Sequence, residues 1–346
     1  MWPFSSEKNP AKPSFNSARK YSIRLPTCTL SFLAPKPEGE NIPSDFDYSE
    51  IQSTSEAFDD LLNTFGELVN RFVDLFGSSW SMKGVPLISH SVGSVGFSIR
   101  LIETPWLGVN ESLFCPKVLV DCLQKEFSFL SKNRTYSLAP ESNRDLNDYH
   151  VPKELDMLGC HWTILSGCPV LYKESINLRD SVNDVEYIVP IDDNRYLRIA
   201  GHLWRNVNNA GNYIRADQRV PLEPFKEVVD EIVKSISITP TPKLAAGIAM
   251  LSASLKKSAP RLSPSPEYVY LAKSALKRAS AFSFRPKPNQ PNEVSAVEAS
   301  GVIDALLTTR AMPGPFPSDG PVTFVHPDAD LSPVPLSFRK EVPPPA

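Results

Sequence analysis

Residues 187–205, YIVPIDDNRYLRIAGHLWR, place two alternating apolar runs on either side of an Asp-Asp-Asn triplet. Alternation with a period of two is typical of strands that bury one face and leave the other face polar. Asp and Asn bond to their own following backbone and tolerate the conformations that tight hairpins require. The stretch therefore predicts two antiparallel strands joined by a turn, and a fold that contains an antiparallel sheet.

The adjacent carboxylates Asp192 and Asp193 have a second interpretation, as an acid–base or metal centre. Hydrolytic carboxylate pairs act across a substrate gap and usually come from different elements of the fold. Two neighbours in one turn rarely provide that spacing. The pattern therefore favours turn chemistry over catalysis at this position.

The strand after the turn carries aromatic and basic side chains on one face. Tyr, Trp and Arg are the side chains that dominate hot spots in protein interfaces. Two interpretations fit this face: it contacts a protein partner, or a helix of the same chain covers it. The candidate partner-binding residues on this face are Tyr196, Arg198, His202 and Trp204.

Other segments extend the pattern of strands and helices. Alternation predicts strands within residues 20–34 and 94–103, and apolar spacing predicts helices over 116–130 and 221–236. Residues 53–77 carry the strongest helix signal, because a Ser-x-x-Glu capping box precedes Phe and Leu residues at three- and four-residue spacing. The sequence predicts an α+β fold in which twisted antiparallel sheets are flanked by helices.

The order of these elements predicts five regions. A polar, irregular stretch at 132–150 separates two halves with a similar order of elements, although no residue-level repeat supports duplication. Many of the 34 prolines crowd toward the C-terminus, which is typical of an extended tail. The regions are a flexible N-terminus (1–19), two α+β units (20–135 and 145–242), a basic helical segment (243–285) and a Pro-rich extended tail (286–346).

No catalytic, cofactor-binding or metal-ligating pattern is present in the sequence. The segment SVGSVGFS superficially resembles a phosphate loop, but it lacks GxxxxGK[ST] and opens a strand pattern. The five histidines form no HxH or HExxH spacing. The five cysteines form no CxxC pair, and their apolar surroundings predict buried, reduced thiols. The sequence therefore predicts a non-enzymatic protein without a cofactor or metal.

Two alternatives remain open. Residues 243–287 hold nine Lys or Arg against one acid, Glu267, so this segment is a candidate for binding an anionic ligand or nucleic acid. The net charge of −3 nevertheless argues against a general polyanion binder. The other alternative is a hydrolase whose site assembles from distant side chains, with these candidates: Cys28, Cys160, Cys168, His90, His161 and His202.

The N-terminal segment MWPFSSEKNP lacks the continuous apolar core of a secretory signal. No run of about 18 apolar residues, the length that a membrane-spanning helix needs, occurs in the chain. The sequence predicts a cytoplasmic protein with no membrane span.

Three segments together resemble a pattern of bacterial interbacterial-toxin immunity proteins, in particular those paired with type VI secretion lipase effectors. They are YSIRLPTCTLSF (21–32), YIVPIDDNRYLRIAG (187–201) and FKEVVDEIVKSISI (225–238). The resemblance covers roughly residues 20–240, and the basic, Pro-rich C-terminal third departs from it.

This resemblance implies one or two Mog1/PsbP-like α+β units. In such units a twisted antiparallel sheet carries helices on its faces, and a last helix leads into an SI-x-I strand, here residues 235–238. No catalytic residue comes with the resemblance. It implies an immunity or adaptor protein that binds a bacterial toxin or effector and either neutralises or escorts it.

Overall fold

The computed structural model describes most of the chain up to residue 264 and a few positions beyond it. The described residues are 6–37, 43–51, 57–62, 68–84, 91–131, 135–137, 150–152, 154–177, 182–207, 213–260, 262–264, 297, 300–301, 304, 316 and 322–324. Within these ranges, every helix is too short or too polar to cross a membrane.

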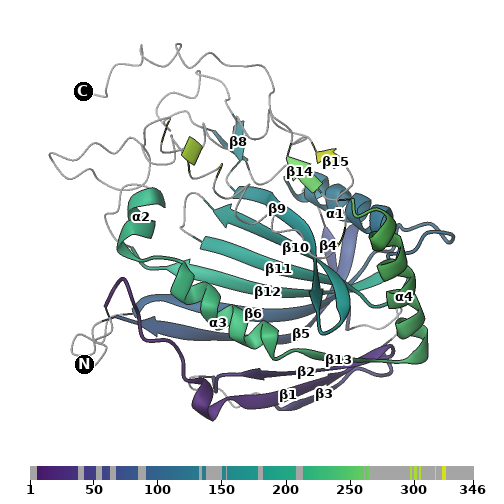
Figure 1. The fold of residues 1–346 in the computed structure, drawn as a ribbon, viewed down its shortest axis with the longest axis horizontal. Helices are drawn as coiled ribbons and strands as arrows, with labels where there is room; N and C mark the ends of the chain where they lie inside the picture. Colours follow the sequence, from purple (N-terminus) through teal and green to yellow (C-terminus); the bar gives the residue numbers. More distant parts are fainter. Residues whose placement is uncertain are drawn as a thin grey trace.

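A seven-stranded antiparallel sheet forms the body of the molecule (Figure 1). Its central strand, β12, pairs with β6 along eleven residues and with β11 on its other side. In spatial order the strands are β4 (Asp59–Leu62), β5 (Leu68–Lys83), β6 (Ser91–Glu103), β12 (Arg195–Arg205), β11 (Val182–Pro190), β10 (Cys168–Asn177) and β9 (Glu154–Leu165).

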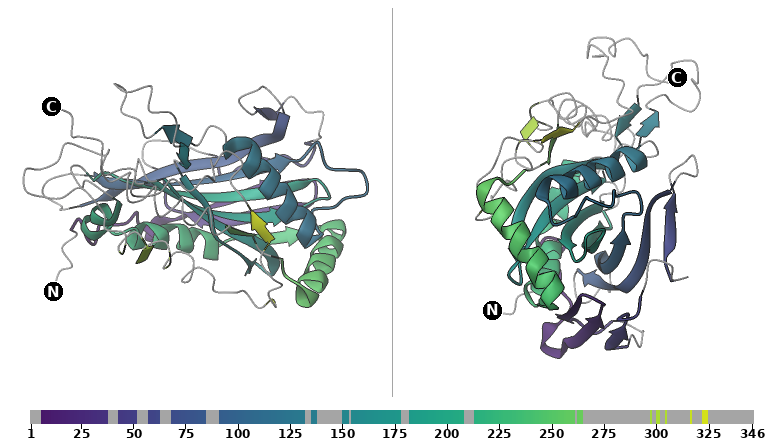
Figure 2. Two further views of the ribbon diagram at one scale, coloured as in Figure 1. Left: turned by 90° about the horizontal axis from the view of Figure 1, so that it is seen from above. Right: turned by 90° about the vertical axis from the view of Figure 1, so that its right-hand side faces the viewer.

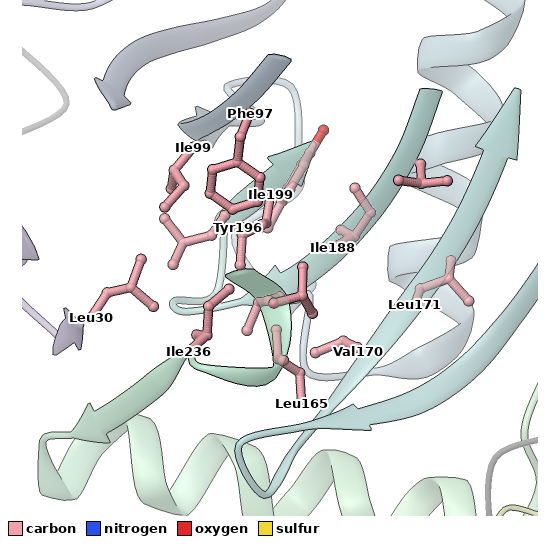
Figure 3. Packing of buried hydrophobic residues seen from close by; sticks show 14 of the residues in the cluster. Leu30, Phe97, Ile99, Leu165, Val170, Leu171, Ile188, Tyr196, Ile199 and Ile236 are labelled. Carbon is pink, nitrogen blue, oxygen red and sulfur yellow. The ribbon is translucent and has the colours of Figure 1, made fainter. Parts of the chain in front are cut away.

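A smaller, four-stranded sheet packs against the large one. Phe32 of the small sheet meets Phe76 and Phe97 of the large sheet, with ring centroids 5.0 and 5.9 Å apart. Figure 3 shows Leu30 and Ile236 among the side chains of the same continuous core. In spatial order the strands of the small sheet are β13 (Ser237–Pro240), β2 (Cys28–Ala34), β1 (Arg19–Arg24) and β3 (Asp45–Asp47).

Helices contact both faces of the large sheet (Figure 2). Helix α3 (Glu223–Lys234) packs on the same face as the small sheet. There Gly201 of β12 leaves room for Val229, since a Cβ at residue 201 would lie 2.6 Å from a methyl group of Val229. Helix α1 (Pro116–Ser131) contacts the opposite face, where Glu126 accepts a hydrogen bond from Tyr196. Side chains of consecutive strand residues point to opposite faces, so residues 196 and 201 lie on different sides.

The remaining elements are short or lie at the periphery. Helix α4 (Pro242–Lys257) buries Leu244, Gly247, Leu251 and Leu255, the residues of one helical stripe. The others are η1 (Phe15–Ser17), β7 (Thr135–Ser137), β8 (His150–Pro152), α2 (Tyr213–Arg219), β14 (Leu262–Pro264) and β15 (Val322–Phe324).

The predicted α+β class with antiparallel sheets is confirmed. The helices expected over 116–130 and 221–236 form α1 and α3. The hairpin of the 187–205 stretch forms β11 and β12, with residues 191–194 as the turn.

The helix predicted over residues 53–77 is wrong, because its described part forms β4 and β5. In β5, Val73 and Leu75 alternate toward the core, and a bulge between Asp74 and Phe76 then places Leu75 and Phe76 next to each other in the core. A bulge shifts the burial pattern by one residue. Because two adjacent residues of β5 are buried, its apolar residues recur at three- and four-residue intervals, as in an amphipathic helix. β-Branched and aromatic residues nevertheless prefer strands.

The two predicted α+β units do not form separate sheets. Strand β6 belongs to the range 20–135 and β12 to the range 145–242, yet these two strands are neighbours in one sheet. One hydrophobic core runs through both ranges. Pairing of distant strands needs a matching register, which the order of elements along a chain does not reveal.

Part of the predicted flexible N-terminus is held against the large sheet. Ala11 and Lys83 exchange backbone hydrogen bonds of 2.7 and 3.1 Å, and Lys12 forms an ion pair with Glu227 of α3. At the other end of the chain, the part of the predicted basic helical segment beyond residue 264, and nearly all of the Pro-rich tail, lie outside the described residues.

Candidate functional site on the polar face of the large sheet

One face of the large sheet is polar over its central three strands. In antiparallel neighbours, residues that lie directly opposite each other point to the same side. The pairing of β12 with β6 and β11 therefore brings polar side chains of all three strands together on the side that α1 contacts. This polar face consists of Ser94, Ser98, Arg100, Asp184, Glu186, Tyr196, Arg198, His202 and Trp204.

Two of the four candidate partner-binding residues, Tyr196 and Arg198, are covered by α1. The hydroxyl of Tyr196 donates to Oε2 of Glu126 over 2.7 Å, and Nη2 of Arg198 donates to Oε1 of the same carboxylate over 2.5 Å. The side chain of Asn70 on β5 donates to Glu126 as well, at 3.0 Å. At this end of the face the structure agrees with the alternative that a helix covers it, since Tyr196 is buried and the side chain of Arg198 is only 14% exposed.

The electrostatics around Glu126 favour its ionised form. Burial alone would raise the pKa of this carboxyl group, but Arg198, Lys173 and the hydrogen bonds from Arg198 and Tyr196 outweigh that effect and hold the pKa below its ordinary value. Glu186 lies on the other side of Arg198, with 3.3 Å between Nε and Oε2. The covered end of the face is thus a network of paired charges that fixes α1 on the sheet.

The other two candidates, His202 and Trp204, lie at the open end of the polar face. Trp204 is 55% exposed, which is unusual for so large an apolar side chain. The side chain of His202 is 44% exposed and bonds to two neighbours on the adjacent strands. Its Nδ1 lies 2.7 Å from Oδ1 of Asp184, and its Nε2 lies 3.2 Å from Oγ of Ser98.

The hydrogen-bonded series of Ser98, His202 and Asp184 could be predicted only in part from the sequence. Alternation placed Ser98 on the polar side of its strand and His202 on the polar side of another strand. The two residues are 104 positions apart, and Asp184 belongs to a third strand. Only the register of β6, β12 and β11 brings the three side chains together.

The Asp184 carboxylate governs the protonation of His202. Its hydrogen bond is the largest cause that raises the pKa of the imidazole above 6.5, whereas burial and the charge of Arg100 act in the opposite direction, and Glu186 adds to the rise. Because the folded-state pKa is raised, the stability that this pair contributes is fully present below about 6.5 and is lost as the pH rises through the folded-state pKa.

We expect an NMR titration of His202 to show a pKa above the ordinary value of 6.5, and replacement of Asp184 with Asn to lower it. Asp193→Asn is the control, since Asp193 lies in the turn and accepts from Ser112 instead. An Asp184→Asn variant whose His202 titrates as in the wild type would contradict the assignment of Asp184 as the governing charge.

The carboxylates Asp192 and Asp193 lie in the turn, as predicted. Asp192 accepts the amide of Asp193 and pairs with Arg195 at 2.7 Å and with Lys243 of α4 at 2.8 Å. Burial opposes ionisation of Asp192, but these hydrogen bonds outweigh it and keep its pKa below the ordinary value. Asp192 and Asp193 therefore stabilise the turn, and the ion pair of Asp192 with Lys243 connects the turn to α4.

The cysteines give the alternative of a thiol hydrolase no support. All five are free, and only Cys115 among them is exposed. Burial raises the pKa of Cys28 and of Cys122 to about 12, which leaves little thiolate at neutral pH. Cys160 and His161 are consecutive residues of β9 and point to opposite faces of the strand. Among the described residues, no group of three or more His, Cys, Asp or Glu side chains is arranged to hold a metal ion.

The basic segment is described only in part. Lys256 and Lys257 are exposed in the last turn of α4, while Lys243 at its start pairs with Asp192. Most of the positive charges of 243–287 lie outside the described residues. Binding of nucleic acid or another anion by this segment stays an untested alternative.

A comparison of the chain with protein-family models finds no match. Comparisons with curated proteins and with solved structures find none either.

Proposed function

We propose that this protein is a binding module that captures a protein partner at the open end of the polar face, with Trp204 as the anchor. The observation that carries the proposal is the exposure of this indole at the end of the central strand. A Trp side chain that enters a pocket of a partner buries a large apolar area and donates one hydrogen bond, and Trp is enriched among interface hot spots. His202 lies two residues away on the same face and adds a polar contact.

Charge supports a partner with a basic surface. The chain has a net charge of −3 although residues 243–287 alone hold nine Lys or Arg against one acid, so the remainder of the chain is clearly acidic. Opposite charge on a partner speeds association and excludes acidic competitors. The resemblance to immunity proteins supports a bacterial toxin or effector as this partner, with neutralisation or escort as the outcome of binding.

The test is co-purification with the product of the neighbouring gene, followed by titration calorimetry on the isolated pair. We expect Trp204→Ala to weaken binding at least tenfold, which corresponds to about 1.4 kcal/mol. Met250→Ala is the matched control because Met250 is also an exposed apolar side chain, but it lies on α4. Its affinity should stay within about twofold of the wild type.

Two outcomes contradict this function. One is the absence of any stable complex with the neighbouring gene product. The other is a complex whose affinity is the same for Trp204→Ala as for Met250→Ala, because the open end of the polar face would then lie outside the interface.

A further inference from the structure

The hydrogen bonds of His202 connect a hydroxyl group to a carboxylate through an imidazole. With Nδ1–H donating to Asp184, the neutral ring presents the lone pair of Nε2 to the hydroxyl of Ser98, at 2.7 and 3.2 Å respectively. A serine, a base and a group that orients the base, each within hydrogen-bond reach of the next, are the parts of a nucleophilic triad. Such triads occur on unrelated folds and are recognised by geometry.

The sheet itself holds this geometry. Asp184 and His202 lie directly opposite each other on β11 and β12, while Ser98 lies on β6, diagonal to His202. Gly96 is the residue of β6 directly opposite His202, and a Cβ there would lie 3.3 Å from Cβ of His202 and 3.5 Å from its ring. The absence of a side chain at Gly96 therefore leaves the space in which the imidazole leans toward Ser98.

We propose that Ser98 is a nucleophile for acyl transfer from carboxylic esters, with His202 as the general base and Asp184 as the residue that orients it. This activity goes beyond the proposed function, because partner binding requires no reactive hydroxyl. The side chains of His202 and Asp184 are 44% and 30% exposed, and Ser98 is partly exposed, so an ester carbonyl can reach the hydroxyl from solvent.

The reaction has two steps. Oγ of Ser98 bonds to the carbonyl carbon, and its proton passes to Nε2 of His202. The tetrahedral intermediate then expels the alcohol, which takes that proton, and leaves an acyl-serine. Water attacks the acyl-serine while His202 accepts a proton from it, and collapse releases the carboxylic acid and returns the proton to Oγ of Ser98.

The negative charge of the intermediate needs a partner on the same face. The backbone amides of the central strands are paired within the sheet ladders. A side chain therefore has to supply the positive charge or hydrogen bond that stabilises the oxyanion. Arg100 lies two residues from Ser98 on the same side of β6, and its charge acts on His202. Its guanidinium also pairs with Asp74 at 2.5 Å, which holds it beside the polar face.

A fluorophosphonate probe tests the nucleophile directly, since attack by Oγ of Ser98 on phosphorus displaces fluoride and leaves a stable adduct. We expect intact mass spectrometry of the purified chain to show one adduct, and peptide mapping to place it on Ser98. Ser98→Ala should lose the adduct, and His202→Gln should slow labelling at least about a hundredfold, the usual range for removal of a general base. Hydrolysis of p-nitrophenyl butyrate should follow the same order.

Ser94→Ala is the matched control. Ser94 lies on the same strand and the same face as Ser98, but it is opposite Trp204 instead of beside His202. Its labelling rate should equal that of the wild type, and thermal unfolding of every variant checks that the sheet is intact. Absence of an adduct on Ser98, or labelling of His202→Gln at the wild-type rate, overturns the proposal and leaves the three side chains as a link between strands.

The outcome is independent of the proposed function. Labelling uses the purified chain without a partner, and the calorimetric titration uses no probe. Failure of labelling therefore does not affect the evidence for a binding module, and failure to find a partner does not affect the test of Ser98.

Discussion

Replacement of Glu126 with alanine is expected to lower the free energy of unfolding by about 3–5 kcal/mol, the usual range when one partner of a buried ion pair is removed. The carboxylate accepts hydrogen bonds from Arg198, Tyr196 and Asn70, and it is almost completely buried between α1 and the large sheet. Its loss leaves Arg198 paired with Glu186 but without Glu126, and it removes the acceptor of the buried Tyr196 hydroxyl. Urea denaturation at neutral pH measures the effect.

Two further variants make this prediction specific. Asp121→Ala changes an exposed carboxylate on the same helix and should alter stability by no more than about 0.5 kcal/mol. The double variant Glu126→Leu with Arg198→Met replaces the pair by apolar groups and should recover most of the loss, because no unpaired charge stays buried. A Glu126→Ala variant that is as stable as Asp121→Ala would show that α1 is not held by this network.

The same carboxylate also sets a dependence on pH. The folded-state pKa of Glu126 lies below the ordinary value of 4.5, so its contribution to stability is present above that value and is lost as the pH falls through the folded-state pKa. The difference in stability between the wild type and Glu126→Ala should therefore shrink in acid.

Replacement of Phe225 with alanine is expected to cost about 3–5 kcal/mol of unfolding free energy, the usual range for truncation of a buried phenylalanine. Phe225 is fully buried at the start of α3, and its ring fills the space above Gly93 of β6. A Cβ at residue 93 would lie 2.7 Å from this ring. The cavity left by alanine cannot be filled from the sheet side, because the facing residue has no side chain.

Glu231→Ala is the control for this prediction, since Glu231 lies on the exposed side of the same helix. Its stability should stay within about 0.5 kcal/mol of the wild type. A loss below about 1 kcal/mol for Phe225→Ala would mean that α3 packs on the large sheet more loosely than the structure shows.

Sequence patterns were most informative where one local period decided the structure. The run with Phe225, Val228, Val229 and Ile232 has the spacing of a half-buried helix, and α3 forms there. The triplet at 192–194 has the residue types of a tight turn, and the hairpin forms around it. In both segments the signal is local, because capping, turn formation and amphipathic spacing depend on residues within a few positions of each other.

Residues 53–77 show where local patterns mislead. Their Phe and Leu spacing fits a helix, but in β5 Phe72, Val73, Leu75 and Phe76 belong to a bulged strand beside β6. A bulge breaks the period of two, so the pattern no longer separates strand from helix. The pairing with β6 decided the outcome, and that pairing is a tertiary interaction.

The candidate site was also predictable only in part from local patterns. Alternation along single strands placed His202 and Trp204 on the polar side of β12 and Ser98 on the polar side of β6. It did not show that α1 covers Tyr196, because the position of a helix over a sheet depends on packing of the whole core. It also did not identify Asp184 as the partner of His202.

The sequence by itself determined the α+β class, the presence of antiparallel strands, the turn at 192–194 and the polar side of β6 and β12. These properties follow from local conformational preference and from the period of apolar residues. Only the tertiary structure decided that the two halves share one sheet, which end of the polar face stays open, and that Ser98, His202 and Asp184 meet. These depend on register between strands far apart in the chain, where a shift of one residue would turn every side chain to the other face.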